Sequence, residues 1–229
     1  MSKHVGIVAC SAEGAALCYR TICIESSNTM GEYYHPEITM HTHSLGEYME
    51  YIPKGNWDGV ANLMLSSTSK VAKAGAEFAI CPDNTIHQAF DKVVNSSPIP
   101  WLHIAEEVGR EAKEKGYKKL GVLGTKFLMG GPVYLSKLKD LDIDSIIPDD
   151  NQRKEINNII FQELVNGIFK NDSRLRFNEI ISSLKNKGCD AVVLGCTEIP
   201  LIVIPEKSSL PVLDSTRILA RAAIKYSVI

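Results

Sequence analysis

The sequence has no apolar run long enough to cross a membrane and no surplus of basic residues. Of its 229 residues 45% are hydrophobic and 23% are charged, and the formal net charge is -2. The opening stretch, MSKHVGIVACSAEG, turns to glycine and polar residues too early for a signal peptide. Lysine and arginine are scattered along the chain rather than gathered into a stripe. We therefore expect a globular cytoplasmic protein that binds neither membranes nor nucleic acids.

Metal and redox motifs are also missing. The chain has six cysteines, but no two of them form a Cys-x-x-Cys pair, which argues against a zinc ribbon or a thioredoxin-like site. His41 and His43 would lie on one face of a strand, yet no cysteine or acidic cluster near them completes a set of metal ligands. The glycine-rich stretch GTKFLMGGP does not match a phosphate-binding loop. We expect neither a metal site nor a nucleotide site.

What the sequence does contain is a regular alternation of short β-rich segments and longer amphipathic ones. This is the rhythm of parallel strands joined by crossover helices, and it predicts an α/β fold. The predicted strands lie at 4–10, 37–45, 77–81, 118–125, 143–147 and 190–196, and the predicted helices begin near 13 and span 56–74, 132–139 and 151–187.

The alternation occurs twice. Each half opens with a strand that contains a glycine and closes with a strand followed by a polar triplet. Gly6 precedes Asp83 by 83 − 6 = 77 residues, and Gly121 precedes Cys196 by 196 − 121 = 75 residues. Nearly equal spacings predict two similar α/β units with mostly parallel sheets. Because ligands bind beyond the carboxyl ends of the strands in open α/β sheets, we expect both triplets to face one cleft.

The expected boundary between the two lobes is the segment SSPIPW, which contains two prolines. We assign residues 1–98 together with 210–229 to the first lobe and residues 99–209 to the second. The final stretch, LPVLDSTRILARAAIKY, is typical of a strand followed by a helix. We expect it to return to the first lobe, because the chain ends of two-lobed proteins often cross back.

The two polar triplets contain the side chains that could carry chemistry. A strand end that leads into a helix favours anions, because the first N–H groups of the helix have no partner within it. Asn84, Thr85 and Thr197 could help to bind a carboxylate there, and Cys196 could supply a thiolate as base or nucleophile. Taken singly, Asp83 could be a helix cap and Cys196 a buried apolar residue. Their matched positions favour an acid or base in each lobe.

The stretch VVLGCTEIPL, residues 192–201, resembles the second cysteine motif of the aspartate/glutamate racemase family. The likeness runs nearly end to end, through PDNTIH, IPWLHIAE, LGVLGT and LPVLDST. It implies two Rossmann-like lobes with the active site in the cleft between them, a small amino-acid or carboxylate substrate, no metal or pyridoxal phosphate, and a homodimer. In this family two residues flank the substrate's α-carbon, and each removes or delivers a proton on one face.

The resemblance breaks at the first of those two residues. Both are cysteines in the usual members, but here the first motif reads Asp83-Asn84-Thr85-Ile86-His87, with Asp83 in the place of the cysteine. Cys81 lies two residues deeper in the strand and is expected to be structural. Cys196 and Asp83 are therefore the predicted catalytic pair.

The remaining site residues are predicted by their positions around this pair. The opening loop, VACSAEG, also departs from the family pattern, and Ser11 is the residue there that matches a substrate contact. We expect the substrate to be bound by Ser11, Asn84, Thr85 and Thr197, with Glu198 and His87 behind them.

Three functions remain open at this stage. The first is an amino-acid racemase acting on a small amino acid such as aspartate or glutamate. The second is a related decarboxylase or cis–trans isomerase that uses Cys196 alone, and the third is a noncatalytic protein that binds a small carboxylate. The replacement of the first cysteine is the reason for the second and third, and the third also follows from the family's arginine and glycines that this chain lacks.

Overall fold

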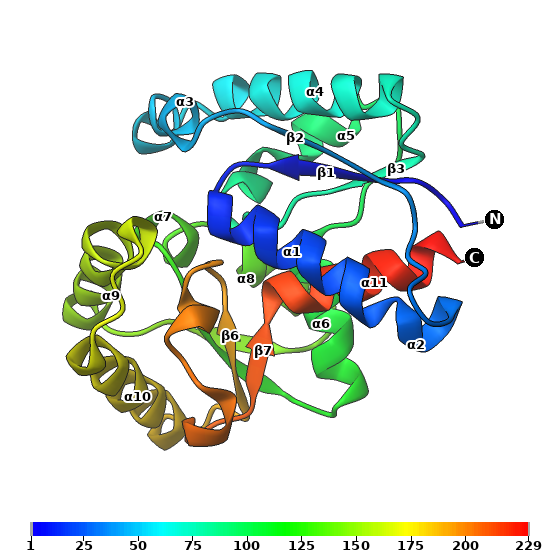
Figure 1. Ribbon diagram of the computed structural model, residues 1–229. Helices are drawn as coiled ribbons and strands as arrows, with labels where there is room; N and C mark the ends of the chain where they lie inside the picture. Colours follow the sequence, from blue (N-terminus) through cyan, green and yellow to red (C-terminus); the bar gives the residue numbers. More distant parts are fainter. Residues whose placement is uncertain (1, 229) are drawn as a thin grey trace. The chain divides into compact units, whose positions relative to one another are not determined.

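The computed structural model describes residues 2–228, which form two compact units (Figure 1). The first unit runs to Glu107 and resumes at Thr216, and the second is Val108–Ser215. The two boundaries expected from the sequence follow residues 98 and 209. They lie nine and six residues before the boundaries of the structure. Among the described residues, no helix is long and apolar enough to span a membrane.

The first unit is built on a parallel sheet with the strand order β2-β1-β3. Helix α4 contacts β1 and β2 on one face, and the apolar side chains of α1 and α11 pack with β1 and β3 into a core on the other. The elements are β1 (Val5–Ala9), α1 (Ala12–Glu25), α2 (Ser27–Met30), β2 (Ile38–Thr42), α3 (Leu45–Met49), η1 (Ile52–Lys54), α4 (Trp57–Lys73), β3 (Phe78–Ile80), η2 (Thr85–Ala89), α5 (Phe90–Val94) and α11 (Ser215–Ser227), with α6 (Ile104–Glu114) crossing the boundary.

The second unit repeats this plan with the strand order β5-β4-β6-β7, again all parallel. Its main core lies between the sheet and the apolar sides of α9 and α10. The elements are β4 (Lys119–Leu123), α7 (Lys126–Met129), α8 (Val133–Lys139), β5 (Asp144–Ile146), α9 (Asp150–Gln162), η3 (Leu164–Asn166), α10 (Asn171–Asn186), β6 (Ala191–Leu194), η4 (Ile199–Leu201), η5 (Pro205–Lys207) and β7 (Val212–Asp214). The predicted α/β fold with two parallel sheets is confirmed.

Several helices begin where the sequence supplies a capping side chain. Ser11 caps α1 by accepting the N–H of Gly14, and Asn56 caps α4 by accepting the N–H of Gly59. Ser44 and Asp149 each form a capping box, with Glu47 at the start of α3 and a glutamine at the start of α9. Each cap satisfies N–H groups that the helix itself leaves without a partner, which is why these helices start where they do.

A glycine in the central strand of each sheet allows a crossover helix to approach closely. A Cβ atom on Gly6 of β1 would lie 2.8 Å from Cγ2 of Val71 on α4. A Cβ atom on Gly121 of β4 would lie 2.7 Å from Cδ1 of Leu184 on α10. The two glycines that marked the repeat in the sequence therefore have the same role, because any side chain there would push the helix away from the sheet.

The C-terminal segment divides between the units, which differs from the predicted return of the whole segment to the first lobe. Its strand, β7, pairs with β6 in the second sheet, whereas α11 packs on the first. Backbone pairing explains this, because β7 extends the sheet from β6 and so satisfies its backbone groups.

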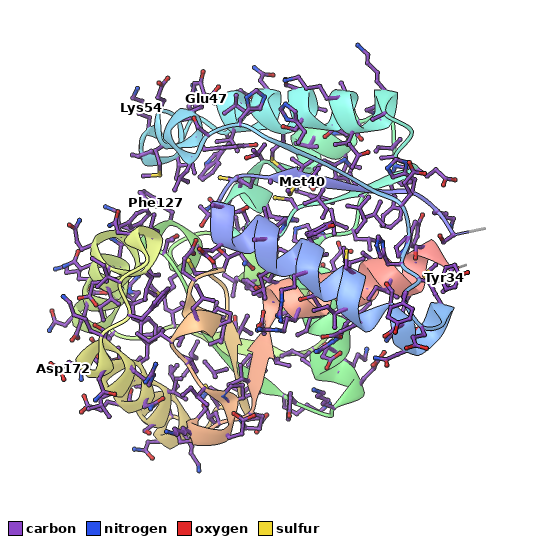
Figure 2. All side chains as sticks on the ribbon, in the orientation of Figure 1. Tyr34, Met40, Glu47, Lys54, Phe127 and Asp172 are labelled. Carbon is purple, nitrogen blue, oxygen red and sulfur yellow. The ribbon has the colours of Figure 1, made fainter. Side chains whose placement is uncertain are left out.

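Figure 2 shows the exposed side chain of Met40 on β2, an edge strand of the first sheet.

Candidate active site

The two polar triplets occupy equivalent positions in their sheets. Gly6 of β1 pairs with Ala79 of β3, and Asp83 follows Ala79 by 83 − 79 = 4 residues. Gly121 of β4 pairs with Val192 of β6, and Cys196 follows Val192 by 196 − 192 = 4 residues. Each triplet therefore follows the strand beside the central one, at the carboxyl edge where ligands bind in folds of this kind.

The carboxylate of Asp83 is held by the beginning of α1. Its Oδ2 accepts the N–H of Cys10 at 3.2 Å, and its two oxygens accept the N–H of Ser11 at 3.2 and 3.3 Å. Ser11 in turn uses its hydroxyl to accept the N–H of Gly14 at 3.3 Å. Backbone donors at the positive end of a helix favour the ionised carboxylate. Asp83 is half-buried, so this charged group also keeps some access to solvent.

The rest of the first triplet forms a short turn. Asn84 is buried, and Thr85 is half-buried at the start of η2. His87 donates from Nε2 to the carbonyl oxygen of Cys81 at 3.0 Å, and its ring stacks on that of Phe90. This bond ties η2 back to the end of β3. His87 thus holds the turn that carries Asp83.

The second triplet is enclosed within its own unit. The thiol of Cys196 donates to Oε2 of Glu198 at 2.9 Å, and the two residues are 9% and 4% exposed. Thr197, between them, is also buried. A carboxylate beside a thiol is an acceptor that orients the sulfur and can exchange a proton with it.

Gly195 explains how Cys196 comes to lie against the end of β4. Its N–H donates to the carbonyl oxygen of Leu123 at 2.7 Å. A Cβ atom at this position would lie 2.8 Å from that same oxygen and 2.5 Å from Cδ2 of Leu128. Only glycine fits without displacing the backbone, so the Gly-Cys order in the motif has a steric cause.

Two further residues at these edges were not predicted. Tyr48 of α3 is fully buried, and its hydroxyl has no hydrogen-bond partner among the described residues. Burial raises the pKa of Tyr48 far above its ordinary value, and the nearby groups Cys81, Cys10 and Asp83 raise it further. The hydroxyl is therefore neutral beside the turn that carries Asp83. In the second unit Thr125 caps α7, as Ser11 caps α1. Its place just after the strand, at the end of the stretch LGVLGT, was the signal that could have revealed it.

The histidines that could have formed a metal site are hydrogen-bonded to other groups. His41 Nδ1 lies 2.9 Å from the hydroxyl of Ser67, and Lys70 donates to His41 Nε2 at 3.0 Å. Burial lowers the pKa of His41, and the positive charge of Lys70 lowers it further. His43 Nε2 lies 3.1 Å from the hydroxyl of Ser66. In the described part of the chain, no group of three or more His, Cys, Asp or Glu residues is arranged to hold a metal.

Known proteins share this sequence pattern and fold. The broad specificity amino-acid racemase RacX of Bacillus subtilis (strain 168) is 23% identical over 171 residues, which cover 73% of this chain and 72% of that protein. The crystal structure of a candidate Asp/Glu racemase from Yersinia pestis matches with a TM-score of 0.89 and 31% identity, over 99% of this chain and all of the other. That of an aspartate racemase homologue from Pyrococcus horikoshii OT3 matches with a TM-score of 0.86 and 29% identity, over the full length of both.

The family profile described as Asp/Glu/hydantoin racemase matches residues 7–223, a range that includes both triplets and both central strands. The match thus extends over both units and agrees with the repeated sheet plan. This chain belongs to the Asp/Glu/hydantoin racemase family.

Proposed function

We propose that this protein is an amino-acid racemase that transfers the α-proton directly, with Asp83 and Cys196 acting on opposite faces of the substrate. The observation that carries this proposal is the equal register of the two triplets. Asp83 follows Ala79, the strand partner of Gly6, by four residues. Cys196 follows Val192, the strand partner of Gly121, by four residues. Both side chains can take or give a proton. Racemisation requires proton removal on one face and delivery on the other, so a paired acid and base suits it.

The protonation states suggested by the hydrogen bonds give a balanced reaction. Asp83 accepts two backbone N–H groups and so starts as a carboxylate, whereas Cys196 donates to Glu198 and so starts as a thiol. The carboxylate takes the α-proton, and the C–H bonding pair stays on the substrate as a carbanion stabilised by its own carboxyl group. The thiol then protonates the other face. The opposite enantiomer reacts by the reverse path.

After one turnover in this direction, Asp83 is neutral and Cys196 is a thiolate beside the Glu198 carboxylate. Two negative groups in a buried position repel each other, and the N–H donors around Asp83 lose the charge that they favour. Both effects drive the proton back toward the starting arrangement. Glu198 thus promotes the return of Cys196 to the thiol form, in addition to orienting it.

The substrate's carboxylate is assigned to the remaining polar groups of the turns. Asn84, Thr85 and Thr197 are the proposed contacts, because each lies within two residues of Asp83 or Cys196. Ser11 is a further proposed contact, as expected from the sequence. Its N–H also holds Asp83 and its hydroxyl accepts the N–H of Gly14, so it positions the Asp83 carboxylate as well.

The names of the relatives narrow the first substrates to test. RacX is a broad specificity amino-acid racemase, and the Pyrococcus horikoshii protein is an aspartate racemase homologue. We therefore propose a small amino acid, with aspartate and glutamate first and other small amino acids next. We also propose that the protein acts as a homodimer in the cytoplasm, which light scattering and cell fractionation test.

The decisive experiment is proton NMR in deuterated water with each enantiomer of aspartate and glutamate. The expected result is loss of the α-proton signal from both enantiomers of at least one amino acid, together with formation of its mirror image. Release of carbon dioxide from a tested substrate, or conversion of maleate offered separately as a substrate, would instead indicate a decarboxylase or cis–trans isomerase. Thermal stabilisation by these ligands without any turnover would contradict the racemase and indicate a binding protein.

A further inference from the structure

The second unit contains a cavity that neither triplet lines. Its volume is about 580 Å³, within the usual range of about 300–1,000 Å³ for small-molecule sites. The walls come from β4, α7, α8, the end of β5 and the first turn of α9. Most of them are apolar, and they include Val122, Leu128, Met129, Ile146 and Ile147.

Among the described residues that line this cavity, Arg153 is the one ionised side chain. It pairs with the exposed Asp150, one turn earlier on α9, through Nη2. Its Nε is enclosed and has no hydrogen-bond partner among the described residues, although the side chain as a whole is 30% exposed. Because Nε is enclosed, the terminal N–H groups of the guanidinium are the ones that can meet a ligand in the cavity.

The geometry of the remaining wall suits a close approach by a ligand. Gly130 and Gly131 follow α7 and carry no side chain that would fill the space. Tyr134 also lines the cavity, and burial raises the pKa of its hydroxyl, which remains neutral. One cation in an otherwise neutral and mainly apolar cavity selects for a single negative charge on an apolar body.

We propose that this cavity is a binding site for a small monocarboxylate with an apolar body, whose carboxylate pairs with the guanidinium of Arg153. A carboxylate matches the planar guanidinium of arginine and would pair with its terminal N–H groups, because the side chain is 30% exposed while Nε itself is enclosed. The hydrocarbon part would cover Leu128, Ile146 and Ile147. Aspartate and glutamate lack such an apolar body, so this ligand class differs from the proposed substrates.

The test is a ¹H–¹⁵N NMR titration of the full chain with hexanoate and with benzoate. Saturable shifts are expected at the amides of Gly130, Gly131 and Ser145, which line the cavity. Hexan-1-ol, which has the same chain but no charge, should bind at least tenfold more weakly. Saturation by hexan-1-ol at the same concentration would overturn the role of the carboxylate.

Two substitutions on α9 separate this site from nonspecific binding. Arg153→Gln should weaken hexanoate binding at least tenfold, and Arg153→Lys, which keeps the charge but loses the fork, should be intermediate. The matched control is Lys154→Gln, which removes the adjacent, exposed cation outside this cavity and should leave binding unchanged. Equal binding by the wild type and Arg153→Gln, or no shift at millimolar ligand, would overturn the proposal.

A third variant separates this proposal from the proposed function. Cys196→Ala removes the thiol, and Cys196 is not among the residues that line the cavity. Hexanoate should bind this variant as tightly as it binds the wild type, whether or not the protein racemises any amino acid. Loss of binding in Cys196→Ala would place the ligand at the second triplet and overturn the separate site.

Discussion

The two units are alike at the amino edge of their sheets and differ at the carboxyl edge. At the amino edge the same device appears twice. Glu77, just before β3, accepts the N–H of His4 at 2.8 Å, and Asp190, just before β6, accepts those of Lys118 and Lys119 at 2.7 and 2.9 Å. In both units a carboxylate thus holds the chain at the point where the central strand begins.

At the carboxyl edge the two halves differ in the hydrogen-bond partners of their acid and base side chains. Asp83 reaches the beginning of α1, a helix far away in sequence, whereas Cys196 bonds to Glu198, only two residues later. One half therefore favours a charged acceptor and the other a neutral donor. The comparison teaches that the repeated backbone sets where a side chain stands, while the choice of side chain and partner sets what it can do.

The largest effect on the racemisation rate is expected when the proton-transfer residue of either unit is replaced. Asp83→Asn and Cys196→Ala should each lower racemisation by at least about 10³-fold, because each removes one of the two proton-transfer groups. Exchange of the α-proton measured by NMR in deuterated water should persist best for a different enantiomer in each variant. This outcome would assign one face of the substrate to each residue.

Matched controls lie elsewhere in the same units. Cys189→Ala removes a buried thiol from the second unit, and Asp91→Asn removes an exposed carboxylate from the first, so both should retain activity. If Asp83→Asn and Cys196→Ala slowed exchange of the same enantiomer to the same extent, the assignment of opposite faces would be wrong.

A smaller effect is expected from the partner that only the second half possesses. Glu198→Gln keeps the size of the side chain and an oxygen near the thiol, but it removes the charge and the ability to exchange a proton. Turnover should fall by about 10²-fold. The control is Glu206→Gln, which changes an exposed glutamate of η5. Unchanged kcat in Glu198→Gln would show that Glu198 has only a packing role.

The smallest effect is on stability and concerns the amino edge, where the two units are alike. Backbone N–H groups, first that of Lys118 and then that of Lys119, hold the pKa of Asp190 below its usual value. A lowered pKa in the folded state means that the ionised carboxylate stabilises the fold above the unfolded-state pKa, and that this is lost as pH falls through the folded-state value. Asp190→Asn should therefore cost about 0.5–1 kcal/mol near neutral pH, discounted because Asp190 is exposed.

Urea unfolding at pH 7 and at pH 3 measures this difference. The gap between the wild type and Asp190→Asn should be largest at pH 7 and shrink at pH 3. Asp144→Asn, which changes an exposed carboxylate on β5, should show a smaller gap at pH 7. A gap for Asp190→Asn that grew as the pH fell would contradict the assigned sign.

Much of the plan was predictable because its causes are local. Strand and helix patterns depend on neighbouring residues, so the alternation and both central glycines could be identified in the sequence. The nearly equal spacings from Gly6 to Asp83 and from Gly121 to Cys196 predicted two similar units, and the strand registers confirm that similarity. The roles assigned to Asp83 and Cys196 remain predictions.

Other features depend on contacts between residues distant in sequence. No pattern near Asp83 indicates that Cys10 and Ser11 hold its carboxylate, and no motif marks Tyr48 beside that turn. The division of the C-terminal segment between β7 and α11 also depends on which sheet each element meets.

The sequence by itself determined the order of strands and helices, the repeat and the two turns that carry acid and base groups, because these depend on periodicity and local turn chemistry. Only the tertiary structure decided that the N–H groups of Cys10 and Ser11 hold the Asp83 side chain and that Arg153 lines a cavity of about 580 Å³. The physical reason is that the hydrogen bonds, burial and electrostatic surroundings of a side chain are set by elements that only folding brings together.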